Sequence, residues 1–201
     1  MKVNELRELL KNTDDKFSVF ADVEVIRTLD ITIKEICDVI DEFLTDEQKV
    51  ELLELPHFKK TKPSFKGLIG IKIKSDESKM RLLNDDEFLK DMPGYYIEDI
   101  IMSLNEDNKL KILYNEKLWQ EHDDLKHCSK EILKQLSVSK RIELLRDKTL
   151  IREVLKIDEW IIKEFVKDLP SEDAKLELMG VYQFGQSYVV EILTTFSDKT
   201  C

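Results

Sequence analysis

The densest group of possible metal ligands in the chain lies between positions 122 and 128. It consists of His122, Asp123, Asp124, His127 and Cys128. On a helix, residues four apart share a face, so Asp123 could act together with His127. The two histidines would lie about 140° apart around the helix axis and would not converge. Acids in a first helical turn are favoured by the helix dipole in any case, so we expect no metal here and no cofactor in the chain.

A run of lysines is the second group with a possible chemical role. Six lysines between Pro56 and Ser75 meet no acid in that interval, namely Lys59, Lys60, Lys62, Lys66, Lys72 and Lys74. The whole chain carries 32 Lys and Arg against 42 Asp and Glu, a formal net charge of −10. This balance disfavours nucleic acids and acidic membranes as partners. The lysine run is therefore the one stretch expected to attract an anionic partner, and the alternative is a solvated loop whose lysines cover apolar surface.

Tyr95 and Tyr96 are the third set of candidate binding residues. Adjacent residues on a helix point to different faces, so we expect at least one ring to be partly exposed and able to contact a partner. The alternative is that both rings pack against neighbouring helices. The sequence contains no glycine-rich phosphate loop, no His-Glu-x-x-His motif and no Ser or Cys beside a His that also has a plausible third group to orient the His. These absences argue against an enzyme.

Five similar segments recur along the chain and define the helices on which these candidates are expected to lie. Each begins with a small polar residue, has Lys or Arg four residues later, then a pair of apolar residues, and another apolar residue five positions beyond the pair. The segments begin at Thr45, Ser75, Asn105, Ser137 and Ser171, at spacings of 30, 30, 32 and 34 residues. The basic residues are Lys49, Lys79, Lys109, Arg141 and Lys175, the pairs are Leu52/Leu53, Leu82/Leu83, Ile112/Leu113, Leu144/Leu145 and Leu178/Met179, and the last positions are Phe58, Phe88, Leu118, Leu150 and Phe184. A fixed period of this length indicates an array of structural repeats.

Each segment has the composition of a helix start. Ser, Thr or Asn at the N-cap accepts a hydrogen bond from an amide of the first turn. Acids after the cap are stabilised by the positive end of the helix dipole. Four of the segments have these acids, whereas the one at Ser137 has Val138 and Ser139 instead; in those four we expect the basic residue to form a solvated pair with the acid three residues before it. The alternative is a row of cations that binds a ligand. Apolar residues before each cap, such as Ile40 and Ile100, indicate a second helix, so the repeat is predicted to be a hairpin of two helices.

Several regions depart from this simple pattern. Residues 1–44 are predicted to be a degenerate N-terminal capping unit, in one continuous domain with the repeats of residues 45–201. Residues 64–74 are predicted to be a distorted helix or an extended segment, because Gly67 and Gly70 replace apolar residues there. Ser197 resembles a further cap, which indicates either a longer array or an end that docks a second copy.

Large side chains and cysteines give further local expectations. The helix that starts after Asn105 is expected to reach Trp119, and Trp160 and Phe165 are expected in the core. The chain has three cysteines, Cys37, Cys128 and Cys201, and no two of them are spaced closely enough for a typical metal-binding pair. The first two are expected to be buried free thiols. This pattern, and a start interrupted by charges, favour a reducing cytoplasm, without signal peptide or membrane span.

The predicted fold is all-α, an α-solenoid of about six stacked helical hairpins with a possible irregular segment at 64–74. In this broad sense the chain resembles HEAT, armadillo and TPR repeat proteins. Its period is shorter than that of the first two, and the Trp-Leu-Gly-Tyr pattern of the third is missing, so no functional residue is carried over from them.

Three functions are compatible with such an array. The leading hypothesis is a non-enzymatic scaffold or adaptor that binds another protein. The first alternative is an acidic inhibitor that mimics nucleic acid and blocks the basic channel of an enzyme, which requires acids gathered on one face. The second is an enzyme built on helical repeats, which would need a basic groove with an acid and aromatic residues. The net charge of −10 disfavours the enzyme.

Overall fold

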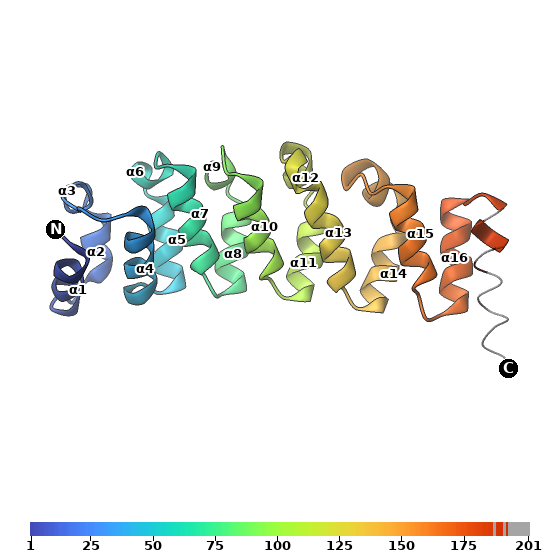
Figure 1. The fold of residues 1–201 in the computed structure, drawn as a ribbon, viewed down its shortest axis with the longest axis horizontal. Coiled ribbons are helices and arrows are strands. Elements are labelled where there is room, and N and C mark those ends of the chain that lie inside the picture. Colours follow the sequence, from blue (N-terminus) through green and yellow to red (C-terminus); the bar gives the residue numbers. More distant parts are fainter. Residues whose placement is uncertain (187, 191, 193–201) are drawn as a thin grey trace. The chain divides into compact units, whose positions relative to one another are not determined.

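The computed structural model of the chain describes residues 1–186, 188–190 and 192. Its regular elements in this part of the chain are all helical (Figure 1), which confirms the all-α expectation. The chain divides into two compact units, Met1–Asn108 and Lys109–Cys201, and the boundary lies inside helix α11 (Glu106–Leu113). The expected cap at Ser197, and the self-association based on it, lie outside the described residues.

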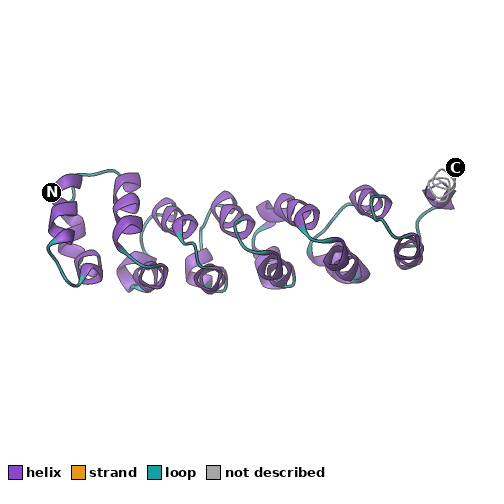
Figure 2. Ribbon diagram, turned by 90° about the horizontal axis from the view of Figure 1, so that it is seen from below, coloured by secondary structure: helices purple, strands orange, loops and turns teal. Residues whose placement is uncertain are grey.

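The first unit consists of short helices joined by tight turns. In chain order they are α1 (Val3–Lys11), α2 (Lys16–Ala21), α3 (Val23–Arg27), α4 (Ile33–Phe43), α5 (Asp46–Glu54), α6 (Pro56–Lys59), α7 (Pro63–Lys72), α8 (Asp76–Leu83), α9 (Asp86–Leu89) and α10 (Gly94–Met102). Helix α7 packs between α4 and α10, while α5 packs against α8 and against α7. The longer helices of this unit therefore form two adjoining rows, visible nearly end-on in Figure 2.

The repeat contains three helices where the sequence predicts two. A short helix separates the two longer ones in the series α5–α6–α7 and again in α8–α9–α10. Pro56 is the first residue of α6, and the side chain of Asp85 accepts hydrogen bonds from the first turn of α9. Proline and Asp are residues that begin helices, so each of them restarts the chain in a new direction instead of extending the first helix. The hairpin expectation is wrong in this respect.

The second unit continues the same alternation of long and short helices. It contains α12 (Glu116–Glu121), the 3₁₀ turn η1 (Asp123–Leu125), α13 (Lys126–Gln135), α14 (Val138–Arg146), the π-helical turn η2 (Leu150–Val154), α15 (Glu159–Lys167) and α16 (Glu172–Tyr182). Helix α16 packs against both α14 and α15. A continuous helix from Asn105 to Trp119 does not form, because Asn115 caps α12 by accepting a hydrogen bond from the Leu118 amide at 3.2 Å.

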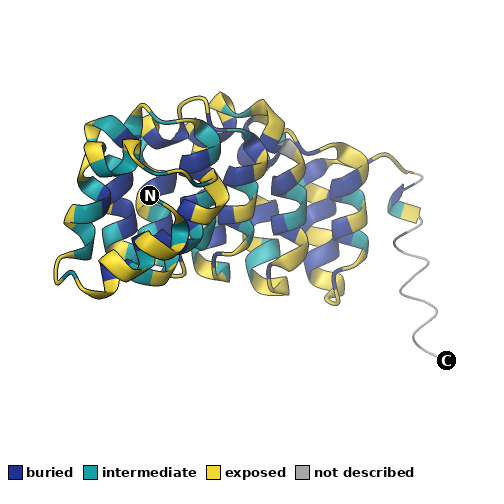
Figure 3. Cartoon of the chain, turned by 60° about the vertical axis from the view of Figure 1, so that its left-hand side comes forward, coloured by how far each residue is buried: buried dark blue, intermediate teal, exposed yellow. Residues whose placement is uncertain are grey.

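The periodic apolar residues of the sequence form the core within each unit. All ten residues of the five apolar pairs are at most 7 % exposed, and so are the five large apolar residues that follow them. Figure 3 shows such buried positions recurring on successive helices. Burying an aliphatic or aromatic side chain stabilises a fold by about 1.5–3 kcal/mol, so these columns account for much of the driving force for folding.

Segment 64–74 is a regular helix over most of its length, which corrects the expectation of a distorted or extended segment. Helix α7 spans Pro63–Lys72, and Gly67, Gly70 and Ile69 are all buried in it. A Cβ atom at Gly67 would overlap the ring of Tyr96 on α10, and one at Gly70 would lie 2.8 Å from the Cδ1 atom of Ile100. The two glycines therefore allow α10 to approach α7 closely. Glycine in a helix interior lowers stability, because it loses more backbone entropy on folding than other residues.

The acid after the N-cap links one repeat to the next. The cap residues Thr45, Ser75, Asn105 and Ser171 each accept a hydrogen bond from the third residue of their helix, as expected. The Asp46 carboxylate accepts hydrogen bonds from the amides of Lys74 and Ser75, at 2.9 and 2.6 Å. Asp76 accepts one from the Asn105 amide at 2.8 Å. These acids therefore hold the turn before the next cap, in addition to any effect on their own helix dipole.

Four of the five recurring basic residues are buried, so the expectation that they are solvated is wrong, although Lys49 does pair with Asp46, three residues before it, at 3.1 Å. Lys49, Lys79, Lys109 and Lys175 are 2 to 9 % exposed. Three of these ammonium groups reach polar groups near the ends of other helices: that of Lys49 lies 3.5 Å from the Lys72 carbonyl, that of Lys79 lies 3.4 Å from the Ser103 carbonyl, and that of Lys109 lies 2.6 Å from Gln135 Oε1. Cations at the C-terminal end of a helix are favoured by its dipole. These residues connect helices, and their burial leaves them unavailable as a row of ligand contacts.

Candidate functional site: an apolar pocket in the first unit

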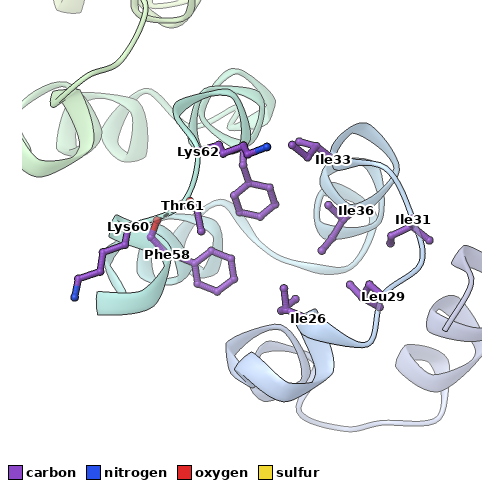
Figure 4. A pocket seen from close by; sticks show the side chains of 10 residues that line it. Ile26, Leu29, Ile31, Ile33, Ile36, Phe58, Lys60, Thr61 and Lys62 are labelled. Carbon is purple, nitrogen blue, oxygen red and sulfur yellow. Dashed lines mark hydrogen bonds between the residues drawn. The ribbon is translucent and has the colours of Figure 1, made fainter.

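An open apolar pocket lies where α3, α4, α6 and the start of α7 meet (Figure 4). Its volume is about 400 Å³, and it is lined by Ile26, Leu29, Ile31, Ile33, Ile36, Phe58, Lys60, Thr61, Lys62 and Phe65. Seven of these ten side chains are apolar. The volume is near the lower end of the range of about 300–1,000 Å³ that is usual for ligand pockets, so it is large enough for one or two bulky side chains but small for a cofactor.

Two short linkers shape the mouth of the pocket. Residues 28–32 join α3 to α4, and residues 60–62 join α6 to α7. Thr32 caps α4, with the Glu35 carboxylate bonded to the Thr32 amide at 2.8 Å. On the other side, the Thr61 hydroxyl donates a hydrogen bond to the Phe58 carbonyl at 2.6 Å. Both linkers are therefore held by local hydrogen bonds, which fix the backbone around the mouth of the pocket.

The pocket has a buried aromatic floor and a partly exposed aliphatic mouth. Phe58 and Phe65 are 2 % and 8 % exposed, and their rings stack with centroids 5.5 Å apart. Ile33, at the first position of α4, is 36 % exposed, and Leu29 and Ile31 are half-buried. A contiguous set of incompletely buried aliphatic side chains is typical of a surface that another molecule covers.

Two residues of the predicted lysine site stand at this mouth. Lys60 and Lys62 are both exposed and line the pocket. In Figure 4 the Lys62 side chain extends towards Ile33, whereas the amine of Lys60 points outwards from the cavity. Neither ammonium group has an ion-pair partner in the described part of the chain. The lining itself contains no acid, so the rim is positively charged.

The other four predicted lysines lie elsewhere. Lys72 pairs with Asp38 at 2.8 Å, and Lys59 lies 4.0 Å from Asp85. Lys66 is buried, with its ammonium 3.2 Å from the carbonyls of Glu87 and Phe88, and burial lowers its pKa despite the acids nearby. Lys74 is exposed. The predicted run is therefore divided among α6, the linker 60–62, α7 and the turn after α7, and only the two linker lysines, Lys60 and Lys62, line the pocket.

The two tyrosines have opposite environments, as expected of adjacent helical residues. Tyr95 is 58 % exposed, whereas Tyr96 is 9 % exposed and lies against Gly67. The ring centroids are 4.2 Å apart. A hydrogen bond with Tyr95, together with burial, raises the pKa of Tyr96 to about 12. Tyr96 is thus part of the core, and of the two rings only that of Tyr95 is exposed.

The second unit contains a groove of a different character. It lies between α13 and α15, has a volume of about 570 Å³ and is lined in part by Trp160, Ile161 and Phe165. Trp160 is 65 % exposed, so the expectation that it lies in the core is wrong, whereas Phe165 is buried as expected. Three cationic side chains in the lining, Lys130, Lys134 and Arg141, are balanced by three acidic ones, Glu131, Glu164 and Asp168. The groove therefore favours neither sign of charge.

The histidine and acid cluster is not arranged to ligate a metal. Within the described residues, no three His, Cys, Asp or Glu side chains are grouped as ligands would be. The helix breaks here, with η1 at Asp123–Leu125, and Asp123 lies 3.6 Å from the Lys156 ammonium. Cys128 and Cys37 are both buried, as expected. Burial raises the pKa of the Cys37 thiol to about 12, which makes it a poor nucleophile.

Comparison with protein families, with curated proteins and with solved structures gives no match to this chain. Function must therefore be argued from the chain's own residues. In the described residues, none of the helices has both the length and the apolar character needed to cross a lipid bilayer.

Sequence reasoning missed the aliphatic half of the pocket. Leu29, Ile31 and Ile33 alternate with polar residues around the turn before α4. This alternation could have indicated an apolar surface, since a linker that only connects two helices does not require regularly spaced aliphatic residues. Which residues face them could not be read from the sequence, because Phe58 and Phe65 lie about 30 positions away.

Proposed function

We propose that this protein is a non-enzymatic scaffold that binds another protein, built as an α-solenoid of about six repeats similar in the broad sense to HEAT and armadillo arrays. The buried periodic columns and the hydrogen bonds from Asp46 and Asp76 to the following repeat support such stacking in the first unit. Each repeat is too small to bury its own apolar face, so neighbouring repeats must cover it.

The apolar pocket of the first unit is the observation that carries this proposal. Its mouth exposes aliphatic side chains, and its floor is a buried pair of phenylalanines. Binding at such a place buries apolar surface at little cost in reorganisation, because the linkers are already held by hydrogen bonds. A protruding apolar side chain of a partner protein is the simplest group that fits it.

The acidic-inhibitor alternative has less support than the scaffold. It needs many unpaired acids on one face, and several acids of the described chain are engaged internally. Arg81 pairs with Glu54 at 2.5 Å, and Arg146 pairs with Glu177 at 2.7 Å. Asp46 and Asp76 are used by the turns of the next repeat. The enzyme alternative stays a prediction that no observation favours.

The proposal is tested by selecting binders from a random peptide library displayed on phage, with the purified chain as bait. We expect enriched peptides that bind the wild-type chain and lose binding to an Ile33→Glu variant. Ile33 is exposed at the first position of α4, where an acid is favoured by the dipole, so the variant is expected to fold.

Leu9→Glu is the matched control for this selection. Leu9 is 41 % exposed on α1 and does not line the pocket, so the same change of chemistry occurs outside the proposed site. Selected peptides should bind this control as well as they bind the wild-type chain. Failure to enrich any peptide, or binding that Ile33→Glu leaves intact, would overturn the proposal.

A further inference from the structure

The charge around the pocket limits the kind of segment that it can take. The chain has a formal net charge of −10, yet the lining of this pocket has two cationic side chains and no acid. Two acids stand close to these residues in the sequence without lining the pocket: Asp30, between Leu29 and Ile31, and Glu35, whose carboxylate accepts hydrogen bonds from the amide and hydroxyl of Thr32 at 2.8 Å. The mouth is therefore a positive area on an acidic protein, and such areas attract anionic partners.

We infer that the pocket accepts an acidic segment of a partner protein, one that places a bulky aliphatic or aromatic side chain inside and Asp or Glu residues beside it. This inference rests on the proposed scaffold function and specifies its ligand. The apolar side chain contacts Leu29, Ile31 and Ile33 above the phenylalanine floor. The flanking carboxylates lie within reach of Lys62, whose side chain extends across the mouth, and of Lys60 on its outer edge.

The two lysines suit this role because their charges are not used within the protein. Lys59, Lys66 and Lys72 are each bound to an acid or to carbonyl oxygens, whereas Lys60 and Lys62 have no ion-pair partner in the described chain. Removing either ammonium group therefore costs no internal contact. Both side chains are exposed, so we expect them to contribute mainly to selectivity and to the rate of association, while the apolar contact supplies most of the affinity.

The test uses three fluorescent peptides with one common Leu-Phe-Leu core and different flanks. The flanks are runs of Glu, of Gln or of Lys, and binding to the purified full chain is measured by fluorescence anisotropy at low and at high salt. We expect the Glu-flanked peptide to bind more tightly than the Gln-flanked one by about 2- to 20-fold, the combined effect of two exposed charge pairs. This advantage should shrink as salt is added, because exposed charges are screened.

Charge reversal on the protein provides the second arm. In a Lys60→Glu/Lys62→Glu variant the preference should invert in favour of the Lys-flanked peptide. Lys74→Glu/Lys90→Glu is the matched control: it changes the net charge of the same unit equally, at exposed lysines that do not line the pocket. This control should keep the preference of the wild-type chain for Glu flanks.

Each other outcome has a definite meaning. Equal binding of all three peptides, abolished by Ile33→Glu, would overturn the acidic preference and leave the scaffold function standing. A preference for Glu flanks that survives Lys60→Glu/Lys62→Glu would place the acidic recognition elsewhere and overturn the inference. If dodecanoate saturates the pocket and no peptide binds, the pocket takes a small anionic amphiphile, and the inference falls together with the peptide-binding role.

Discussion

Asp46 Oδ2 accepts a hydrogen bond from the backbone amide of Ser75 at 2.6 Å and another from that of Lys74 at 2.9 Å. The acid of one repeat start thus holds the start of the next, 29 residues further along the chain. Asp76 and Asn105 repeat the arrangement at 2.8 Å. This relationship gives the acid after the N-cap a role in joining successive helices, and it can be tested directly.

Replacing Asp46 by Ala should destabilise the first unit. The change leaves two backbone amides and the Lys49 ammonium without the carboxylate, and unsatisfied groups of this kind cost about 1–3 kcal/mol. Glu51→Ala serves as control, since Glu51 is exposed on the same helix, and it should change stability by less than about 0.5 kcal/mol. Urea unfolding followed by circular dichroism measures both. Equal stability of the two variants would contradict the assigned role.

The contribution of Asp46 should also depend on pH. Burial raises the pKa of Asp46, but hydrogen bonds from the Ser75 amide, the Lys49 ammonium and the Lys74 amide outweigh it and lower the pKa below the ordinary value. A carboxylate with a lowered folded-state pKa stabilises the fold above its unfolded pKa of about 3.9 and loses that effect as the pH falls further.

The corresponding experiment compares wild-type chain with Asp46→Asn from neutral pH to about pH 3. The stability difference between the two should be largest near neutral pH and should shrink below about pH 4, because the protonated Asp46 resembles Asn in charge. Other carboxylates that titrate in the same range are present in both proteins and cancel in the difference. A difference that stays constant down to pH 3 would be inconsistent with this account.

Lys49 should matter more than Lys79, although both occupy the same position in the repeat. The Lys49 ammonium lies 2.6 Å from Asp41 and 3.1 Å from Asp46, whereas that of Lys79 bonds to the Ser103 carbonyl at 3.4 Å. Lys49→Met leaves two carboxylates without their cation, and we expect a loss of about 2–3 kcal/mol, somewhat below the value for a fully buried pair because both acids keep some contact with water.

Lys79→Met is the comparison for this prediction. It removes one hydrogen bond to a carbonyl and keeps the apolar stem, so its cost should be about 1 kcal/mol. Both variants are measured by urea unfolding at neutral pH. The explanation fails if Lys79→Met proves the more damaging of the two.

Gly67→Ala should be destabilising although alanine is the better helix former. The added Cβ atom overlaps the Tyr96 ring, and overpacking of this kind costs about 1–3 kcal/mol or more. Gly180→Ala in α16 is the reverse case, since its Cβ would meet no atom within 4 Å. It should stabilise the second unit by about 0.5–1 kcal/mol.

Thermal unfolding of both glycine variants tests the close approach of α7 and α10. A double variant, Gly67→Ala/Tyr96→Ala, should show strong non-additivity because the ring that clashes has been removed. If Gly67→Ala is as stable as the wild-type chain, α10 does not pack on α7 as described.

The candidate site was predictable only in part. Lys60 and Lys62 were among the lysines selected by charge, but Lys66 and Lys72 were selected by the same criterion and lie buried or paired. The difference arises from their places in the fold: Lys60 and Lys62 lie in the linker before α7, whereas Lys66 and Lys72 lie on α7, which packs against α4 and α10. The sequence did not show that aliphatic residues of the pocket, such as Ile33, lie near Phe58. The two are far apart along the chain, and the residues around each carry no information about this contact.

The sequence by itself determined the starts of the long helices, most of their caps and the buried columns, because hydrogen bonds at a cap and a period of 3.6 residues are local properties of the chain. The tertiary structure alone decided what each recurring polar residue does. The Lys49 ammonium is covered by the carbonyl of Lys72 at the end of α7, a helix that begins more than ten positions further along the chain. Asp46 meets the Ser75 amide only once the repeats are packed together. The pocket exists for the same reason: its two halves come from different helices, and only packing places them face to face.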